Sequence, residues 1–292
     1  MNILTFDIEE WYLVKAYFSA KESRYAEYDR LLDELLQKLD DAGLKATFFC
    51  VGKLATDFPS VVHKINDAGH EVGCHSNTHQ WLNKMTYQEA AEDTAAAIDA
   101  LEQCISKKVL SYRAPAFSIC SSNKWAFEIL AANGITRDAS VFPASRDFGG
   151  FSEFSTDEPA IVNYNGISIK EFPVCTTNFL GKDMAYSGGG YFRFFPLSFV
   201  KKTMVRSNYS MTYFHLGDLL PVILGLMSKS EYENYFGEAG SLKTRLVRYA
   251  KTNFGVKSNK RKLFKLLETT SFDNLLTADE KLDWSSCPVV NL

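Results

Sequence analysis

The chain has 292 residues, of which 46% are hydrophobic and 23% are charged, and its formal net charge is −3. This composition is typical of a globular protein that can bury a large core without a disulfide or a structural metal. The small negative charge excludes an overall attraction to nucleic acid or to anionic membranes.

No targeting or membrane segment is visible in the sequence. The first residues, MNILTFDIEEWY, lack a basic segment followed by a long apolar run, and no apolar run reaches the roughly 18 residues of a transmembrane helix. Six cysteines are scattered without a CxxC pair, and several lie in apolar runs. Such cysteines are typical of buried thiols in a reducing compartment, so we expect a cytoplasmic protein.

Short apolar segments alternate with helical patterns through the first half of the chain. The predicted strands are residues 2–7, 46–51, 70–74, 109–113 and 135–138. The predicted helices run from Asp29 to Gly43, from Pro59 to Gly69, from a capping box at Thr86 to about Cys104, and from Ser121 or Ser122 to Asn133. This alternation predicts a parallel α/β architecture, in which chemistry gathers at the carboxyl ends of the strands.

The second half is less regular. It predicts a hairpin at 161–173 with an Asn-Gly turn, a flexible glycine loop at 187–191, a helix to Met204, a strand at 211–215 and a basic helical region at 229–267. We interpret the basic run 257–265 as a solvated helix face in preference to an anionic-ligand patch, and expect a loose tail after Asp283. Because no repeat or linker is visible, we predict one domain, 1–292, in which residues from about 225 to 292 form a helical extension.

Polar side chains fall at or just after the predicted strand ends: Asp7, Glu9, His75, His79, Arg113 and Asp138. His75 and His79 would point the same way if residues 75–79 made one helical turn. These two imidazoles with one carboxylate from residues 7–10 could hold a divalent ion and leave positions open for water. The alternative is a surface turn that happens to contain two histidines.

These groups could together carry out a hydrolysis. The ion would lower the pKa of water and polarise a carbonyl, and a second carboxylate could take the proton. Arg113 could keep that carboxylate ionised, and His215 could protonate a leaving amine. The set predicts metal-assisted hydrolysis of an amide or ester. Each group also has a structural alternative: solvated acids, a structural ion pair for Arg113, and a core histidine for His215.

Four segments resemble, in order, the motifs of polysaccharide deacetylases with a NodB-homology domain (carbohydrate esterase family 4). They are TFD at 5–7, HSNTH at 75–79, RAPAFS at 113–118 and YFH at 213–215. Residues 138–143 and 189–193 resemble the cytoplasmic branch of that family found in bacterial exopolysaccharide loci. The resemblance extends from about residue 3 to beyond residue 218.

The resemblance implies a distorted (β/α) barrel with about seven parallel strands, to which the sequence adds the hairpin and C-terminal helices. It implies a divalent metal, usually zinc, and hydrolysis of the N-acetyl group of an amino sugar in a glycan or glycan precursor, with release of acetate. Asp7 matches the catalytic base, Arg113 its partner, His215 the general acid, and His75 and His79 the metal ligands. We also expect contacts to the sugar from Trp11, Pro115, Phe117 and Tyr191.

One position departs from the common family pattern, which has two adjacent aspartates as base and ligand. Here Ile8 follows Asp7. Because Asp7 and Glu9 face the same side of an extended chain, Glu9 is the expected third ligand and Glu10 the second choice. A similar spacing occurs in allantoinase-like relatives, so hydrolysis of a non-sugar amide such as a ureide is an alternative. A non-catalytic glycan-binding protein is another.

Overall fold

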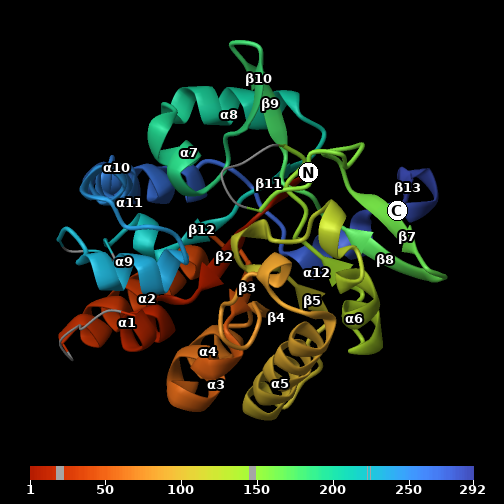
Figure 1. Ribbon diagram of the computed structural model, residues 1–292. Helices are drawn as coiled ribbons and strands as arrows, with labels where there is room; N and C mark the ends of the chain where they lie inside the picture. Colours follow the sequence, from red (N-terminus) through yellow and green to blue (C-terminus); the bar gives the residue numbers. More distant parts are fainter. Residues whose placement is uncertain (18–22, 145–148, 222, 224) are drawn as a thin grey trace.

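The computed structural model describes residues 1–17, 23–144, 149–221, 223 and 225–292, and Figure 1 shows its strands and helices. The strands are β1 (Asn2–Ile3), β2 (Thr5–Ile8), β3 (Thr47–Cys50), β4 (Glu71–Cys74), β5 (Ser111–Tyr112), β6 (Arg137–Asp138), β7 (Ala160–Tyr164), β8 (Ile167–Glu171), β9 (Thr176–Phe179), β10 (Lys182–Ala185), β11 (Ser210–Met211), β12 (Phe214–His215) and β13 (Val289–Asn291). The α-helices are α1 (Glu10–Tyr17), α2 (Ser23–Asp41), α3 (Gly52–Asp57), α4 (Pro59–Asp67), α5 (Tyr87–Ile105), α6 (Ala126–Ala132), α7 (Gly189–Phe194), α8 (Leu197–Arg206), α9 (Lys229–Phe236), α10 (Leu242–Asn253), α11 (Val256–Leu267) and α12 (Leu275–Lys281).

One sheet forms the centre of the molecule. Its strand order is β12-β2-β3-β4-β5-β6-β8-β7-β13. The first seven strands in this order run parallel, and β7 pairs antiparallel with β8. This confirms the predicted α/β barrel with about seven parallel strands, to which the hairpin of β7 and β8 is attached.

The barrel closes through side chains where the sheet ends. The Tyr209 hydroxyl donates to the Pro173 carbonyl at 2.7 Å, and the Met211 amide donates to Cys175 Sγ at 3.3 Å. The chain after β8 therefore packs against β11, which pairs with β1 in a separate sheet of two strands. Contacts of this kind in place of a continuous ladder make the barrel distorted.

The local sequence explains most of these elements. All residues of β2 and β3 are buried, as expected of strands covered on both faces. The capping box of Thr86 and Glu89 starts α5 as predicted. Asn165 and Gly166 both have positive φ, which the tight turn between β7 and β8 requires.

Two sequence predictions for the second half, the glycine loop and the loose tail, are wrong. The glycine segment 187–191 is not a loop throughout, because α7 begins at Gly189. The basic region 229–267 is helical as predicted, and left-handed breaks at Gly237 and Gly255 divide it into three helices. The tail is not loose, because β13 pairs with β7 and adds an outer strand to the sheet.

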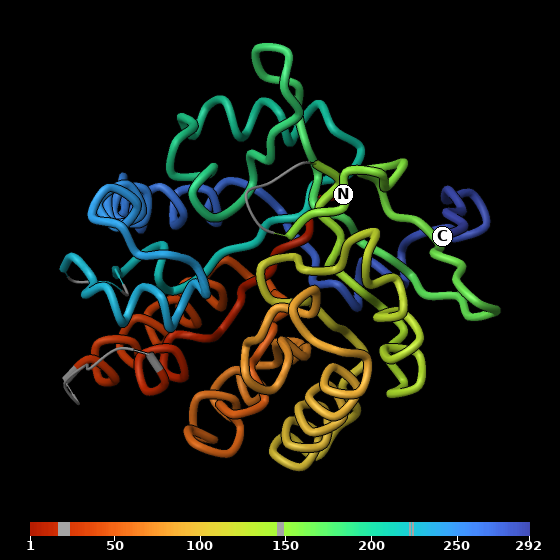
Figure 2. The backbone as a smooth tube through the Cα atoms, in the orientation of Figure 1, coloured from red at the N-terminus to blue at the C-terminus, as the bar shows by residue number. Residues whose placement is uncertain are grey.

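The C-terminal helices cover one side of the barrel. α9 contacts α1, and α11 contacts both α2 and α8. The tube in Figure 2 shows α10 and α11 on the left side, while the C-terminus lies on the right. Among the described residues, no helix combines the length and apolar character needed to cross a membrane.

Candidate metal centre and catalytic site

The carboxyl ends of neighbouring strands bring together the polar side chains that the sequence singles out. β2 supplies Asp7 and leads into Glu9, β4 leads into His75, and β12 ends at His215. β12 and β3 flank β2, and β4 follows β3. The sheet order therefore brings these polar side chains together at one end of the barrel, as predicted.

Glu9, His75 and His79 form a compact cluster of potential metal ligands. One ligand atom from each lies within 4.8 Å of the others. Glu9 Oε2 is 3.6 Å from His75 Nε2 and also contacts His79 Nε2. Burial raises the pKa of the Glu9 carboxyl, but the two histidines outweigh it and hold that pKa well below its usual range. A carboxylate with two imidazoles suits a divalent ion such as zinc.

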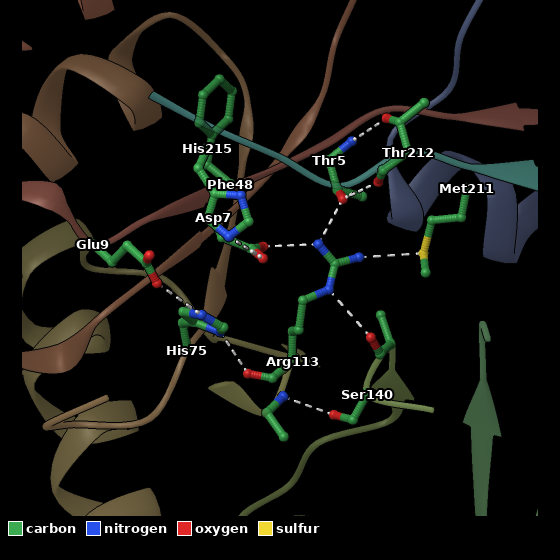
Figure 3. A network of polar contacts seen from close by, with 12 residues as sticks. Thr5, Asp7, Glu9, Phe48, His75, Arg113, Ser140, Met211, Thr212 and His215 are labelled. Atoms are coloured by element: carbon green, nitrogen blue, oxygen red, sulfur yellow. Dashed lines mark hydrogen bonds and ion pairs between the residues drawn. The ribbon is translucent and has the colours of Figure 1, made fainter. Parts of the chain in front are cut away.

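The hydrogen bond of His75 tests whether this cluster fits a cation. His75 Nδ1 lies 2.7 Å from the carbonyl oxygen of Arg113, which can only accept, so Nδ1 carries the proton (Figure 3). In the neutral ring, Nε2 then presents a lone pair to the Glu9 carboxylate. Glu9 Oε2 is itself buried, and among the described residues it has no hydrogen-bond partner apart from its contacts with the two imidazoles. Two electron-rich atoms facing each other in a buried site are stabilised by a cation between them.

The segment that carries the two histidines is a loop and not the helical turn considered from its sequence. Ser76 and His79 both have left-handed backbone conformations. The Asp93 carboxylate, from α5, accepts hydrogen bonds from the Asn77 amide at 2.8 Å and from the Thr78 hydroxyl at 2.8 Å. Asp93 therefore holds the loop in the shape that turns both imidazoles towards Glu9.

Asp7 lies beside this cluster in a separate buried network. Arg113 Nη1 donates to Asp7 Oδ1 at 2.7 Å and to the Thr5 hydroxyl at 2.7 Å, and Arg113 Nε donates to the Ala139 carbonyl at 3.1 Å. Figure 3 shows the guanidinium between these groups. The Arg113 side chain is fully buried, and its guanidinium lies 4.3 Å from the Phe49 ring centroid. This network fixes one oxygen of Asp7 and leaves the other directed towards His215.

His215 completes the polar set on the far side of Asp7. Its Nε2 lies 3.6 Å from Asp7 Oδ2, and its Nδ1 lies 3.2 Å from Asp218 Oδ2. Arg193 Nε lies 3.6 Å from the other oxygen of Asp218. Burial lowers the pKa of His215, but the Asp218 hydrogen bond and the nearby charges of Glu9, Asp218 and Asp7 raise it to about 10. His215 is therefore protonated at neutral pH, as a proton donor must be.

Glu10, the second choice for the third ligand, points elsewhere. It is fully buried at the start of α1, and its Oε1 accepts a hydrogen bond from the Gly217 amide at 2.6 Å. Burial and the charge of Glu9 raise the pKa of Glu10 to about 7. The geometry therefore favours Glu9 as the carboxylate beside the two histidines.

Asp138 also lies at a strand end but does not join the cluster. Its Oδ1 accepts a hydrogen bond from the Ser140 hydroxyl at 2.5 Å, and it is bonded to the Glu171 carboxyl. Burial raises the pKa of Asp138 to about 6, and burial with the charge of Asp138 raises that of Glu171 well above its usual range. Since Ser140 Oγ accepts from the Ala114 amide, this carboxyl pair supports the backbone next to Arg113.

A cavity of about 810 Å³ opens over the cluster. Its floor contains Asp7, Glu9, His75, His79, His215 and Asp218. Its walls are largely aromatic and come from distant parts of the chain: Trp81, Phe117, Tyr191, Phe194, Tyr213, Tyr235, Phe236 and Phe254. Aromatic faces beside a polar floor suit the apolar faces and hydroxyls of a sugar.

Two of the four residues expected to contact the substrate lie at the cavity and two do not. Phe117 and Tyr191 line the cavity. Trp11 does not, because α1 turns its indole into the core, where it packs on Tyr28 at 5.5 Å between ring centroids. Pro115 is buried between two lining residues, Ala114 and Ala116, and is itself absent from the described lining.

Three positioning residues and one wall of the cavity were not predicted from the sequence. Asp93 carries no sequence signal, because a lone acid on an alanine-rich helix is ordinary surface. Asp218 lies three residues after His215, and Arg193 ends the segment 189–193 that resembles the family. The wall formed by α9 and α10 could not be anticipated, because its residues become neighbours of the site only through helix packing.

Comparisons with known proteins agree with this geometry. Residues 3–136 match the family model described as polysaccharide deacetylase, and residues 139–278 match a model described as a domain of unknown function. Two peptidoglycan-N-acetylglucosamine deacetylases from Bacillus cereus are similar to parts of the chain. One is 31% identical over 96 residues, 32% of this chain and 35% of that protein. The other is 39% identical over 70 residues, 22% of this chain and 26% of that protein.

Solved structures share the fold across the whole chain. A candidate polysaccharide deacetylase from Mycobacterium smegmatis has a TM-score of 0.61 at 17% identity, covering 100% of this chain and 92% of that chain. A 4-alpha-glucanotransferase from Thermococcus litoralis has a TM-score of 0.60 at 10% identity, covering 100% of this chain and 41% of that chain. At such identities the likeness concerns the fold alone. Residues 3–136, which hold three of the four clustered motifs, are thus similar to polysaccharide deacetylases.

Proposed function

We propose that the protein hydrolyses the N-acetyl group of an amino sugar in a glycan or glycan precursor, with a divalent metal, and releases acetate. The observation that carries the proposal is the position of Asp7 between Arg113 and His215, beside a three-ligand cluster on the floor of an aromatic cavity. A base, an acid and a cation site at one point are what amide hydrolysis requires.

Glu9, His75 and His79 would hold the metal, for which zinc is the best candidate given one carboxylate and two imidazoles. When bound, such an ion supplies Lewis acidity that polarises an acyl carbonyl and makes water more acidic. The His75 proton donated to the Arg113 carbonyl keeps the ring oriented with Nε2 towards the cluster.

Asp7 is the proposed general base. The hydrogen bond from Arg113 Nη1 to Asp7 Oδ1 keeps the carboxylate ionised and oriented, and Oδ2 is left to accept the proton of the attacking water. Asp7 is buried, so little bulk water competes for that oxygen.

His215 is the proposed general acid. Its Nε2 lies 3.6 Å from Asp7 Oδ2, the oxygen that does not accept from Arg113, and its side chain is 29% exposed and lines the cavity. Asp218 holds Nδ1 and favours the protonated ring. Nε2 can therefore deliver a proton to the amine that leaves when the amide bond breaks.

We also propose that the glycan belongs to exopolysaccharide synthesis and that the protein works in the cytoplasm. The resemblance of residues 138–143 and 189–193 supports the first part, and six unpaired cysteines support the second. The whole chain is proposed to act as one domain, because strands from both matched segments share one sheet and α9 and α10 supply a wall of the cavity.

Release of acetate tests the proposal. Purified protein is stripped with a chelator, reloaded with zinc and incubated with N-acetylated glucosamine oligomers, and acetate is measured. We expect zinc-dependent release by the wild type and loss in Asp7→Asn. The exposed Asp183→Asn on β10 is the matched control and keeps activity.

The same assay separates the alternatives. Hydrolysis of ureides without acetate release from any N-acetyl sugar would replace the deacetylase by a non-sugar amidohydrolase. Binding of the oligomers without turnover of any amide, unchanged in Asp7→Asn, would indicate a glycan-binding protein.

A further inference from the structure

Helix α10 carries an exposed apolar face. Leu242, Leu246 and Val247 are 57%, 49% and 47% exposed, and Phe254 just beyond the helix is 60% exposed. None of the residues of α10 is buried. Leu242 and Leu246 are four residues apart, which places them on one side of the helix. Four of the eleven large hydrophobic side chains that are exposed in the described chain thus lie within 13 residues.

The same segment concentrates positive charge. Residues 242–267 contain nine lysines and arginines and no acid, although the whole chain has a net charge of −3. Some of these cations contact the protein itself: Arg245 donates to the Met227 carbonyl at 2.8 Å, and Lys260 pairs with Glu34. Lys243, Lys257 and Arg261 are exposed. Positive charge is therefore concentrated on this part of the surface, although the net charge of the chain is negative.

This surface is continuous with the mouth of the catalytic cavity. Ala250 and Phe254 line the cavity, and Phe194, 59% exposed, lines it from α7. In Figure 1, α10 lies at the edge of the molecule next to α7 and on the opposite side from β13. Whatever covers the exposed face of α10 also faces the entrance to the site.

We propose that the docking face, formed by Leu242, Lys243, Leu246, Val247 and Phe254, binds the surface of an anionic lipid bilayer. A helix with apolar side chains and lysines on one exposed face, and no acids, buries its apolar side chains at the lipid boundary while the lysines contact the headgroups. A second copy of the chain is a poorer occupant, because two such basic faces would repel each other.

Docking in this way would bring the cavity mouth to the membrane. Under the proposed deacetylase function, the substrate class is then a glycan attached to a lipid carrier, which the aromatic rim receives at the bilayer surface. This extension rests on the proposed function, whereas the membrane binding itself does not.

Co-sedimentation with vesicles tests the docking. The full chain is mixed with phosphatidylcholine vesicles with or without phosphatidylglycerol. We expect binding only to the anionic vesicles, weakened by high salt. Lys243→Gln should lower the affinity about fivefold, since one lysine near an anionic surface contributes about 1 kcal/mol. Val247→Glu should lower it more, because it places a charge in the apolar face.

Val289→Glu is the matched control, because Val289 is 54% exposed on β13, away from α10. It should bind vesicles as the wild type does, and circular dichroism should show all variants folded. Release of acetate from a soluble oligomer should be unchanged in Val247→Glu, so failure of docking and failure of the deacetylase are distinguishable. Absence of anionic-vesicle binding, equal binding by Val247→Glu, or a dimer that Val247→Glu dissociates would overturn the proposal.

Discussion

Arg113 and Asp7 meet at 2.7 Å with both side chains withdrawn from solvent, and the same guanidinium nitrogen also donates to Thr5. The pair connects β2, which contains Asp7, to the residue that directly follows β5. A buried carboxylate that has lost its cationic partner is costly, so this contact ties the proposed base to the stability of the fold.

Replacing Arg113 should therefore affect both stability and turnover. Arg113→Met leaves Asp7 as a buried charge without its partner, and we expect the free energy of unfolding to fall by about 3–5 kcal/mol. Denaturant unfolding measures this change. The double variant Asp7→Asn with Arg113→Met should recover part of the loss, because the uncompensated charge is gone. A double variant that only sums the two single losses would contradict the pairing.

Asp7→Asn should separate catalysis from metal binding. We expect kcat to fall by about 10²–10⁴-fold, since the amide cannot accept a proton as a base. Zinc content, measured by atomic absorption, should stay at the wild-type level, because Asp7 lies outside the ligand cluster. Loss of zinc in this variant would instead make Asp7 a ligand.

Asp218→Asn should shift the pH profile. His215 must be protonated to act, and its raised pKa of about 10 keeps it so through neutral pH. Activity is then lost only as pH rises through that value. Removing the Asp218 charge and hydrogen bond lowers the pKa of His215, so the alkaline limb of kcat/KM should move towards neutral pH. An alkaline limb that stays in place would exclude His215 as the acid that Asp218 supports.

His70 should make stability fall in acid. Burial lowers its pKa to about 4, and its Nδ1 accepts the Ala46 amide at 3.2 Å. In the unfolded chain the pKa of His70 is about 6.5, so the unfolded state binds the proton first as pH falls. The contribution of neutral His70 to the free energy of unfolding is thus complete above about pH 6.5 and is lost as pH falls towards about 4. Urea unfolding should show a weaker pH dependence in His70→Asn than in the exposed control His63→Asn. Equal slopes would contradict this role.

Much of the barrel could be predicted because its strands are apolar runs that end in polar residues. β2 and β4 were found in this way, and with them Asp7 and His75. The hairpin could be predicted because its Asn-Gly turn demands positive φ at both residues. These features depend on local sequence, which is why a single sequence contains them.

The errors concern features that only packing decides. Trp11 is close to the site in sequence, but α1 carries it into the core against Tyr28. The 75–79 loop depends on Asp93, which lies on a helix far along the chain. The position of α10 at the cavity mouth was not predicted, because it follows from helix packing and not from the sequence of α10 itself.

Glutamine substitutions at two adjacent glutamates should distinguish the ligand from its neighbour. Glu9→Gln should lower zinc affinity by at least about tenfold, since it removes the anionic ligand. Glu10→Gln should keep zinc, because Glu10 bonds the Gly217 amide and its pKa of about 7 already favours a partly neutral carboxyl. Titration with zinc under calorimetry measures both, and retention by Glu9→Gln with loss by Glu10→Gln would reverse the assignment.

Anomalous diffraction from crystals grown with zinc tests the central claim most directly. We predict one peak at about 2.0–2.3 Å from Glu9 Oε2, His75 Nε2 and His79 Nε2, with Asp7 outside the coordination shell. A peak coordinated by Asp7 or Glu10 in place of Glu9, or no peak at the cluster, would contradict it.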